Sequence, residues 1–141
     1  PEFERNFMNI LIIDAQGGGI GRQLVVAIKQ HNANADITAV GTNCVATAAM
    51  LKAGADRAAT GENAIIVGCR KADVIIGPVG IVIADSMLGE ITPAAAVAVG
   101  QSQARRILIP VNQCDNIIVG VSDLGIGKLI QGVVDTLSNL G

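Results

Sequence analysis

Short apolar runs alternate with longer helical patterns along most of the chain, and this alternation constrains the fold more than any other feature. Runs that are apolar at nearly every position are typical of strands buried on both faces of a parallel sheet. The helical patterns between them carry one apolar face, which would cover such a sheet. The expected strands are residues 9–14, 36–40, 56–60, 73–77, 106–111 and 116–121, and the expected helices are residues 20–28, 43–53, 62–72, a segment that starts at Pro93, and residues 126–137.

The order of these segments predicts a single three-layer α/β domain of the doubly wound, Rossmann-like class. The weakest expected strand, residues 56–60, is third in the chain, and the sheet order 3-2-1-4-5 would place it at an edge, where little burial is required. Only residues 112–115 separate the last two expected strands, which is too short for a parallel crossover. We therefore expect a mostly parallel sheet whose last strand is antiparallel or a bent continuation of its predecessor. Residues 79–88 fit either a helix or a strand.

The first seven residues, "PEFERNF", are charged and aperiodic, and Met8 follows them directly before the first expected strand. We interpret residues 1–7 as a tail added during cloning, and residues 8–141 as the Rossmann-like domain.

Composition excludes several classes of partner. The chain has no Trp or Tyr and a formal net charge of -2, so it offers neither the basic patch nor the stacking aromatics that nucleic acids need. No apolar run is long enough for a membrane span. The cysteines form no CxxC pair, and with no secretory signal after Met8 they indicate reduced thiols in a cytoplasmic protein. No His/Cys cluster predicts a metal site.

Four glycines stand where the first strand should meet the first helix, in "DAQGGGIGR". Ligands of doubly wound sheets bind beyond the carboxyl ends of the strands, where the strand order reverses. Backbone N–H groups and the positive end of the helix dipole would face a phosphate there, and glycine would let it approach closely. The alternative is that the glycines only let the helix pack tightly on the strand. The candidate binding residues in this loop are Gly17, Gly18, Gly19, Ile20, Gly21 and Arg22.

The loop resembles the T-G-x-x-x-G-x-G loop of short-chain dehydrogenases at Gly19, Ile20 and Gly21, although Asp14 and Ala15 replace the opening Thr-Gly. Those enzymes use a catalytic tyrosine, and a chain without tyrosine cannot follow their mechanism. The loop also lacks the Lys-Ser/Thr of a P-loop. We expect Asp14 to cap the turn.

The second strand ends in "GTN", which has no acid to hold the ribose hydroxyls of NAD. This absence favours NADP or an adenine mononucleotide as the ligand.

Of Cys69 and Cys114, Cys69 is the more plausible low-pKa thiol, because it lies beside Arg70 and Lys71. The polar or backbone groups expected at the same rim of the sheet are those of Thr42, Asn43, Gly77, Pro78 and Asn112.

Over nearly all of residues 8–141 the chain resembles a family of small Rossmann-like proteins from anaerobic bacteria that is classed as a domain of unknown function. The segments that carry the resemblance are "IDAQGGGIGRQLV", "GTN", "LKAGAD", "ATGENAI", "ADVIIGP" and "GEITPA". The resemblance implies a Rossmann-like fold and no particular activity.

Two hypotheses on function follow. The first is a domain that binds a nucleotide, a dinucleotide or another phosphorylated small molecule at the glycine loop, with or without a reaction. The second is a noncatalytic homo-oligomeric module without a nucleotide. Between Val74 and Ala104 only Asp85 and Glu90 carry charge, which predicts a homodimer or homotetramer built through residues 79–104.

Overall fold

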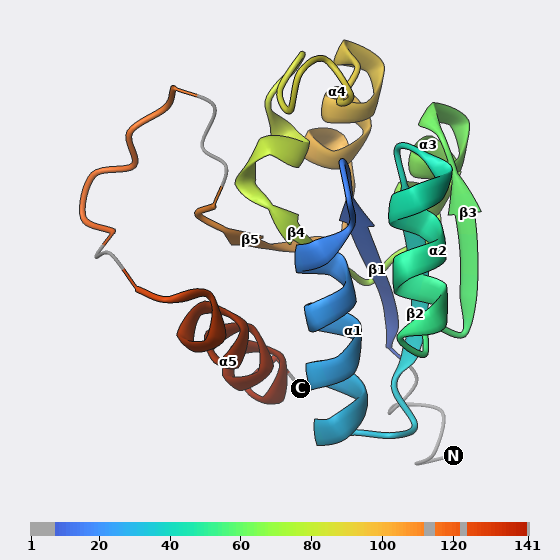
Figure 1. Ribbon diagram of the computed structural model, residues 1–141, viewed down its shortest axis with the longest axis vertical. Coiled ribbons are helices and arrows are strands. Elements are labelled where there is room, and N and C mark those ends of the chain that lie inside the picture. Colours follow the sequence, from blue (N-terminus) through green and yellow to red (C-terminus); the bar gives the residue numbers. More distant parts are fainter. Residues whose placement is uncertain (1–7, 112–114, 122–123, 141) are drawn as a thin grey trace.

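A parallel sheet of five strands lies at the centre of the computed structural model, which describes residues 8–111, 115–121 and 124–140 (Figure 1). The sheet order is β3-β2-β1-β4-β5, as the sequence predicts for the first five strands. The weak strand β3 lies at one edge, and β1 lies between β2 and β4. The strands are β1 (Asn9–Asp14), β2 (Asp36–Gly41), β3 (Arg57–Thr60), β4 (Val74–Pro78) and β5 (Arg105–Ile109).

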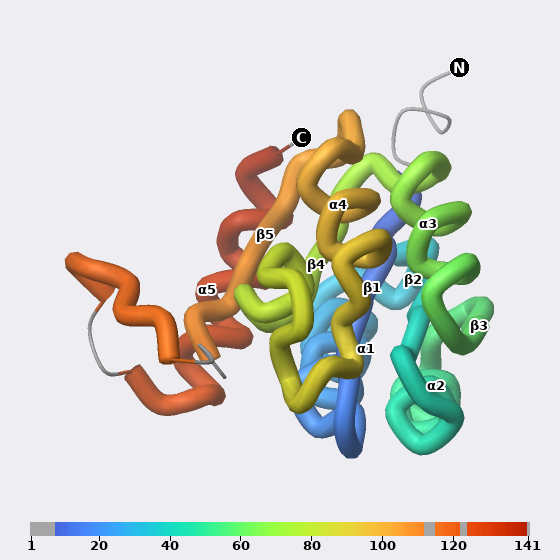
Figure 2. Tube along the Cα trace, turned by 90° about the horizontal axis from the view of Figure 1, so that it is seen from above, coloured from blue at the N-terminus to red at the C-terminus, as the bar shows by residue number. Residues whose placement is uncertain are grey.

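The central strands are apolar because both of their faces are covered. In β1 every residue after Asn9 is buried, and Ile12 pairs with Ala39 of β2 and with Ile76 of β4. The helices on one face are α1 (Gly19–His31), α2 (Cys44–Lys52) and α5 (Ile126–Ser138). The other face is covered by α3 (Glu62–Lys71) and α4 (Pro93–Gln101), which lie side by side in Figure 2.

Two helices begin at caps that the sequence contains. The Thr92 hydroxyl accepts a hydrogen bond from the N–H of Ala95 at 3.1 Å, so α4 starts at Pro93 as predicted. The side chain of Asn43 accepts one from the N–H of Ala46 at 3.0 Å and caps α2. Among the described residues, no helix is long and apolar enough to cross a membrane.

The prediction of an antiparallel last strand is wrong. The last strand of the sheet is β5, which pairs with β4 in parallel, and the described residues 115–121 contain no strand. Asp115 and Gly120 have positive φ values of 66° and 88°, which interrupt an extended conformation. These residues run away from the sheet (Figure 1), with 90% of Ile117 and 93% of Val119 exposed.

Residues 79–88 form neither the regular helix nor the strand that the sequence allows. A 3-10 helix, η2 (Val79–Val82), follows β4 directly, and hydrogen-bonded turns continue from there. Asp85, Met87, Leu88 and Gly89 all have positive φ. Local pattern could not predict this, because three of the four are not glycine. We call residues 83–92 the β4–α4 loop.

Candidate functional site

The carboxyl ends of β1, β2 and β4 meet at one edge of the sheet, where ligands of doubly wound folds bind. The N–H of Thr42, just after β2, donates to the carbonyl of Asp14, the last residue of β1, at 3.1 Å. Asn112 lies outside the described residues. The predicted site residues that the strand ends bring to this edge are Gly17, Gly18, Gly19, Gly21, Thr42, Asn43, Gly77 and Pro78.

Two of the loop glycines are required by packing. Gly18 has a φ of 74°, and a Cβ there would lie 2.8 Å from the Cα of Ala46 in α2. A Cβ on Gly21 would lie 2.4 Å from the Sδ of Met50, also in α2. Gly77 is similar, since a Cβ there would lie 2.5 Å from the carbonyl oxygen of Ile13. At these three positions, close packing of the chain explains why the residue is glycine, without any ligand.

Gly17 and Gly19 have a different environment. Both are exposed, and a Cβ on either would meet no atom within 4 Å. Within the described part of the chain, neither N–H donates a hydrogen bond. Gly19 is the first residue of α1, so its N–H lies at the positive end of the helix dipole. The backbone is therefore open at the Cβ position of both residues, and their N–H groups are available to an anionic group.

Asp14 caps the turn, as expected. Its side chain is 3% exposed, and its two carboxylate oxygens accept hydrogen bonds from the N–H of Ala15 at 2.8 Å and the N–H of Gly21 at 2.7 Å. Burial raises the pKa of Asp14, and the nearby charge of Glu90 also raises it, whereas the bonds from Gly21 and Ala15 lower it. The N–H of Gly21 is thus occupied by the protein itself.

Two predicted loop residues do not face the strand ends. Arg22 is exposed and lines a shallow hollow between α1 and α5, together with Gln131. Ile20 packs partly buried against the core beneath α1. Neither side chain is placed to hold a ligand beside Thr42.

Glu90 is the residue at this edge that the sequence analysis did not identify as part of the site. It belongs to the β4–α4 loop, yet its Oε1 accepts hydrogen bonds from the N–H of Gln16 at 2.8 Å, the hydroxyl of Thr42 at 2.6 Å and the Nδ2 of Asn43 at 2.9 Å. Asn43 also donates to the carbonyl of Gln16 at 2.9 Å. The segment "GEITPA" shows only an acid ahead of a helix cap, so no local pattern signals contacts this far along the chain.

This contact removes the basis for preferring NADP to NAD. The preference depended on the lack of an acid at the end of β2, whereas the structure puts the Glu90 carboxylate against Thr42 and Asn43 at that position. Hydrogen bonds from Thr42, Gln16 and Asn43 hold the pKa of Glu90 below its ordinary value. The carboxylate is therefore ionised at neutral pH.

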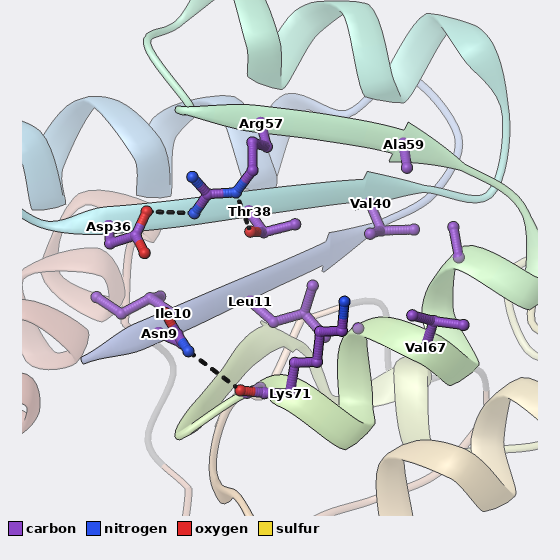
Figure 3. A pocket seen from close by; sticks show the side chains of 13 residues that line it. Asn9, Ile10, Leu11, Asp36, Thr38, Val40, Arg57, Ala59, Val67 and Lys71 are labelled. Atoms are coloured by element: carbon purple, nitrogen blue, oxygen red, sulfur yellow. Dashed lines mark hydrogen bonds and ion pairs between the residues drawn. The ribbon is translucent and has the colours of Figure 1, made fainter. Parts of the chain in front are cut away.

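A separate hollow of about 390 Å³ lies between α3 and the sheet (Figure 3). Arg57 points along the strands toward Asp36, with which it forms an ion pair, and its Nε donates to the Thr38 hydroxyl at 3.2 Å. Asn9 and Lys71 close the other side, where the Nδ2 of Asn9 donates to the carbonyl of Lys71 at 3.3 Å. Asn9, Asp36 and Arg57 begin their strands, so this hollow lies toward the opposite end of the sheet from the glycine loop.

The expectation for Cys69 is wrong. Its thiol is buried between α3 and the rest of the core, and burial raises its pKa to about 11 despite the neighbouring Arg70 and Lys71. Arg70 and Lys71, which follow the buried Cys69 on the helix, are both exposed. Cys114 lies outside the described residues, and Cys44 is exposed at the start of α2.

Comparison with known proteins identifies the family. A family model described as "Domain of unknown function (DUF3842)" matches residues 9–140, which confirms the resemblance predicted from the sequence. No curated protein matches the chain. A solved structure, the crystal structure of a dodecameric FMN-dependent UbiX-like decarboxylase from Escherichia coli O157:H7, matches with a TM-score of 0.52 and 15% identity. The match covers 93% of this chain and 95% of that one, and at this identity it shows a shared fold.

Proposed function

We propose that this chain, which belongs to the DUF3842 family, binds a phosphorylated small molecule of the nucleotide class at the glycine loop. The observation that carries the proposal is the pair of N–H groups on Gly17 and Gly19, which donate no hydrogen bond within the described residues and belong to residues with open space at the Cβ position. They lie at the start of α1 and beside the boundary between β1 and β4, where the strand order reverses. A phosphate at this point would gain charge-assisted hydrogen bonds and the favourable end of the helix dipole.

The nucleotide class is supported by the fold. The decarboxylase that shares the fold is FMN-dependent, so FMN belongs among the candidate ligands together with the adenine nucleotides and NADP. All of these ligands join a phosphate to a sugar or, in FMN, to a sugar-alcohol chain. The rim at Thr42 and Asn43 adds polar groups beside the loop. No reaction is assigned to the site.

Equilibrium dialysis tests the proposal directly. The chain has no Trp or Tyr, so the ultraviolet absorbance of an adenine or flavin ring stands clear of that of the protein. FMN, AMP, ADP, ATP, NAD and NADP are dialysed separately against the purified protein. We expect at least one to be retained, and failure of all six at millimolar concentration would refute the proposal.

A substitution locates the binding to the loop. Gly19→Val adds a branched side chain where the backbone is open, so it should abolish retention while the thermal midpoint changes little. The matched control is Gly132→Val in α5, because Gly132 is also exposed and a Cβ added there would meet no atom within 4 Å. The control should bind like the original protein. A Gly19→Val protein that retains the ligand fully would exclude the loop as the site.

We also propose that the chain forms a homo-oligomer. Leu88 is 95% exposed and Val97 51% within the predicted interface 79–104, and Ile117 and Val119 add a second apolar surface in residues 115–121. Large exposed apolar side chains are candidates for burial in an interface between copies. The decarboxylase of the same fold is dodecameric. If no ligand is retained, assembly without a ligand becomes the favoured function.

A further inference from the structure

A carboxylate from a distant loop is fixed at the end of β2. The three donors that hold Glu90 come from the segment after β1 and from the segment after β2, at distances of 2.6 to 2.9 Å. All three bonds end on Oε1, and within the described part of the chain no group donates to Oε2. Glu90 is only partly buried. One oxygen therefore holds the side chain in place while the other is free to accept a hydrogen bond from a ligand.

The Oε2 of Glu90 lies where the sugar of a bound nucleotide would be expected. In doubly wound folds the phosphate lies on the loop after the first strand, and an acid at the end of the second strand accepts hydrogen bonds from the sugar hydroxyls. Gln16, which donates to Glu90, precedes the open Gly17 directly. Glu90 also accepts bonds from Thr42 and Asn43 just after β2, where the sugar of a ligand with its phosphate on the first loop would lie.

We propose that Glu90 accepts hydrogen bonds from free hydroxyl groups of the ligand's sugar, and that the site selects phosphorylated ligands with an unmodified sugar. This inference rests on the proposed function. A phosphate on the 2′ hydroxyl would remove a donor and bring negative charge against Glu90 and the nearby Asp14. Arg22, the nearest cation in sequence to the loop, lines the hollow toward α5 instead. NAD is therefore preferred to NADP, the reverse of the preference drawn from "GTN".

Two matched ligand pairs test the inference by equilibrium dialysis. AMP and 2′-deoxy-AMP differ by one hydroxyl, and NAD and NADP differ by one 2′-phosphate. In each pair, we expect the original protein to bind the member with the free hydroxyl at least about tenfold more tightly. This is the effect expected when one charge-assisted hydrogen bond is lost. Glu90→Gln removes the charge at nearly constant shape, so the difference within each pair should shrink and NADP should gain relative to NAD.

Glu90→Asp provides a second variant in case the amide disturbs the loop. It keeps the charge but is one methylene shorter, so it too should lose the discrimination, and a thermal melt of each variant reports whether it is folded. Equal retention within both pairs by the original protein would overturn the inference, as would tighter binding of every ligand by Glu90→Gln, because Glu90 would then be competing with the ligand. If no ligand is retained by any of the proteins, the proposed function itself fails.

Discussion

At the scale of single residues, the run of glycines separates into two groups with different causes. Gly18 and Gly21 are required because α2 packs against the loop, and Gly18 also needs a positive φ. Gly17 and Gly19 meet no such constraint and are the ones open to a ligand. The sequence shows four equivalent letters, and only the position of α2 tells them apart.

Alanine at two adjacent positions tests this division. Gly18→Ala should cost about 2–4 kcal/mol of unfolding free energy, because it adds both left-handed strain and a clash with the Ala46 backbone. Gly19 is the first residue of α1 and has open space at its Cβ position, so Gly19→Ala should change the free energy of unfolding by less than about 0.5 kcal/mol. Denaturant melts of the two variants measure the difference. Equal costs would show that the loop packs differently from the structure described.

The thiols give a second residue-scale prediction. Cys44 is exposed, whereas Cys69 is buried with a pKa raised to about 11, so little thiolate forms at Cys69 near neutral pH. A short treatment with a thiol-specific reagent, followed by peptide mass mapping, should modify Cys44 and leave Cys69 unmodified. Adding denaturant provides the control, since both should then react. Modification of Cys69 at the same rate in the folded protein would contradict its burial.

At the scale of elements, the β4–α4 loop is the segment that shapes the rim. Its left-handed residues turn the chain back so that Glu90 reaches Gln16, Thr42 and Asn43. Leu88, at φ 58° and 95% exposed, adds strain without burying its side chain. The loop therefore holds a conformation that its residue types disfavour and that contacts elsewhere must stabilise.

Substitutions of Leu88 measure that strain. Leu88→Asn should relieve backbone strain by up to about 1 kcal/mol, because asparagine tolerates the left-handed region, and both substitutions compared here remove the same leucine from the proposed interface. Leu88→Val should be less stable than Leu88→Asn by more than about 1 kcal/mol, because a branched Cβ is especially disfavoured there. Thermal melts compare the two proteins. A valine variant as stable as the asparagine variant would show that residue 88 is not left-handed.

The contact of Glu90 with the rim also predicts a pH dependence. The pKa of Glu90 is lowered from 4.5 in the folded protein, so its stabilisation is complete above that value and is lost as the pH falls through the folded pKa. Glu90→Gln should cost about 1 kcal/mol at neutral pH, and the gap should close in acid. Because the charge of Glu90 raises the pKa of Asp14, the comparison reports the titration of the two carboxylates together. A gap that stays constant into acid would show that the ionised form is not favoured.

At the scale of the whole molecule, large apolar side chains are exposed on α2, within residues 79–104 where the interface is expected, and after β5. They are Val45 and Leu51, Leu88 and Val97, and Ile117, Val119, Val121 and Leu124. Light scattering should give a mass above that of one chain. Leu88→Asp with Val97→Asp tests the surface within residues 79–104, and Ile117→Asp with Val119→Asp tests the one after β5, through a fall in that mass. A monomeric mass for the unaltered protein at micromolar concentration would contradict assembly.

The parallel sheet, its order and the helix caps could be predicted because they depend on local pattern and simple topology. Buried strands such as "NILIID" are apolar throughout, and Thr92 with Pro93 specifies a helix start. The role of Glu90 and the division of the glycines could not be predicted, because both depend on contacts between segments far apart in the chain. Residues 116–121 have the composition of a strand, but backbone turns at Asp115 and Gly120 keep them out of the sheet.

The position of β1 in the middle of the sheet has a consequence for folding during synthesis. β1 leaves the ribosome first, but one of its two neighbours, β4, begins only at Val74, and the N–H of Asn9 bonds to a carboxylate 64 residues away. The apolar strand β1 therefore has one edge unpaired until β4 has been synthesised. Contacts of such large sequence separation slow folding and expose nascent chains to aggregation. The strand order that places β1 between β2 and β4 thus also makes the first part of the sheet dependent on later parts of the chain for its completion.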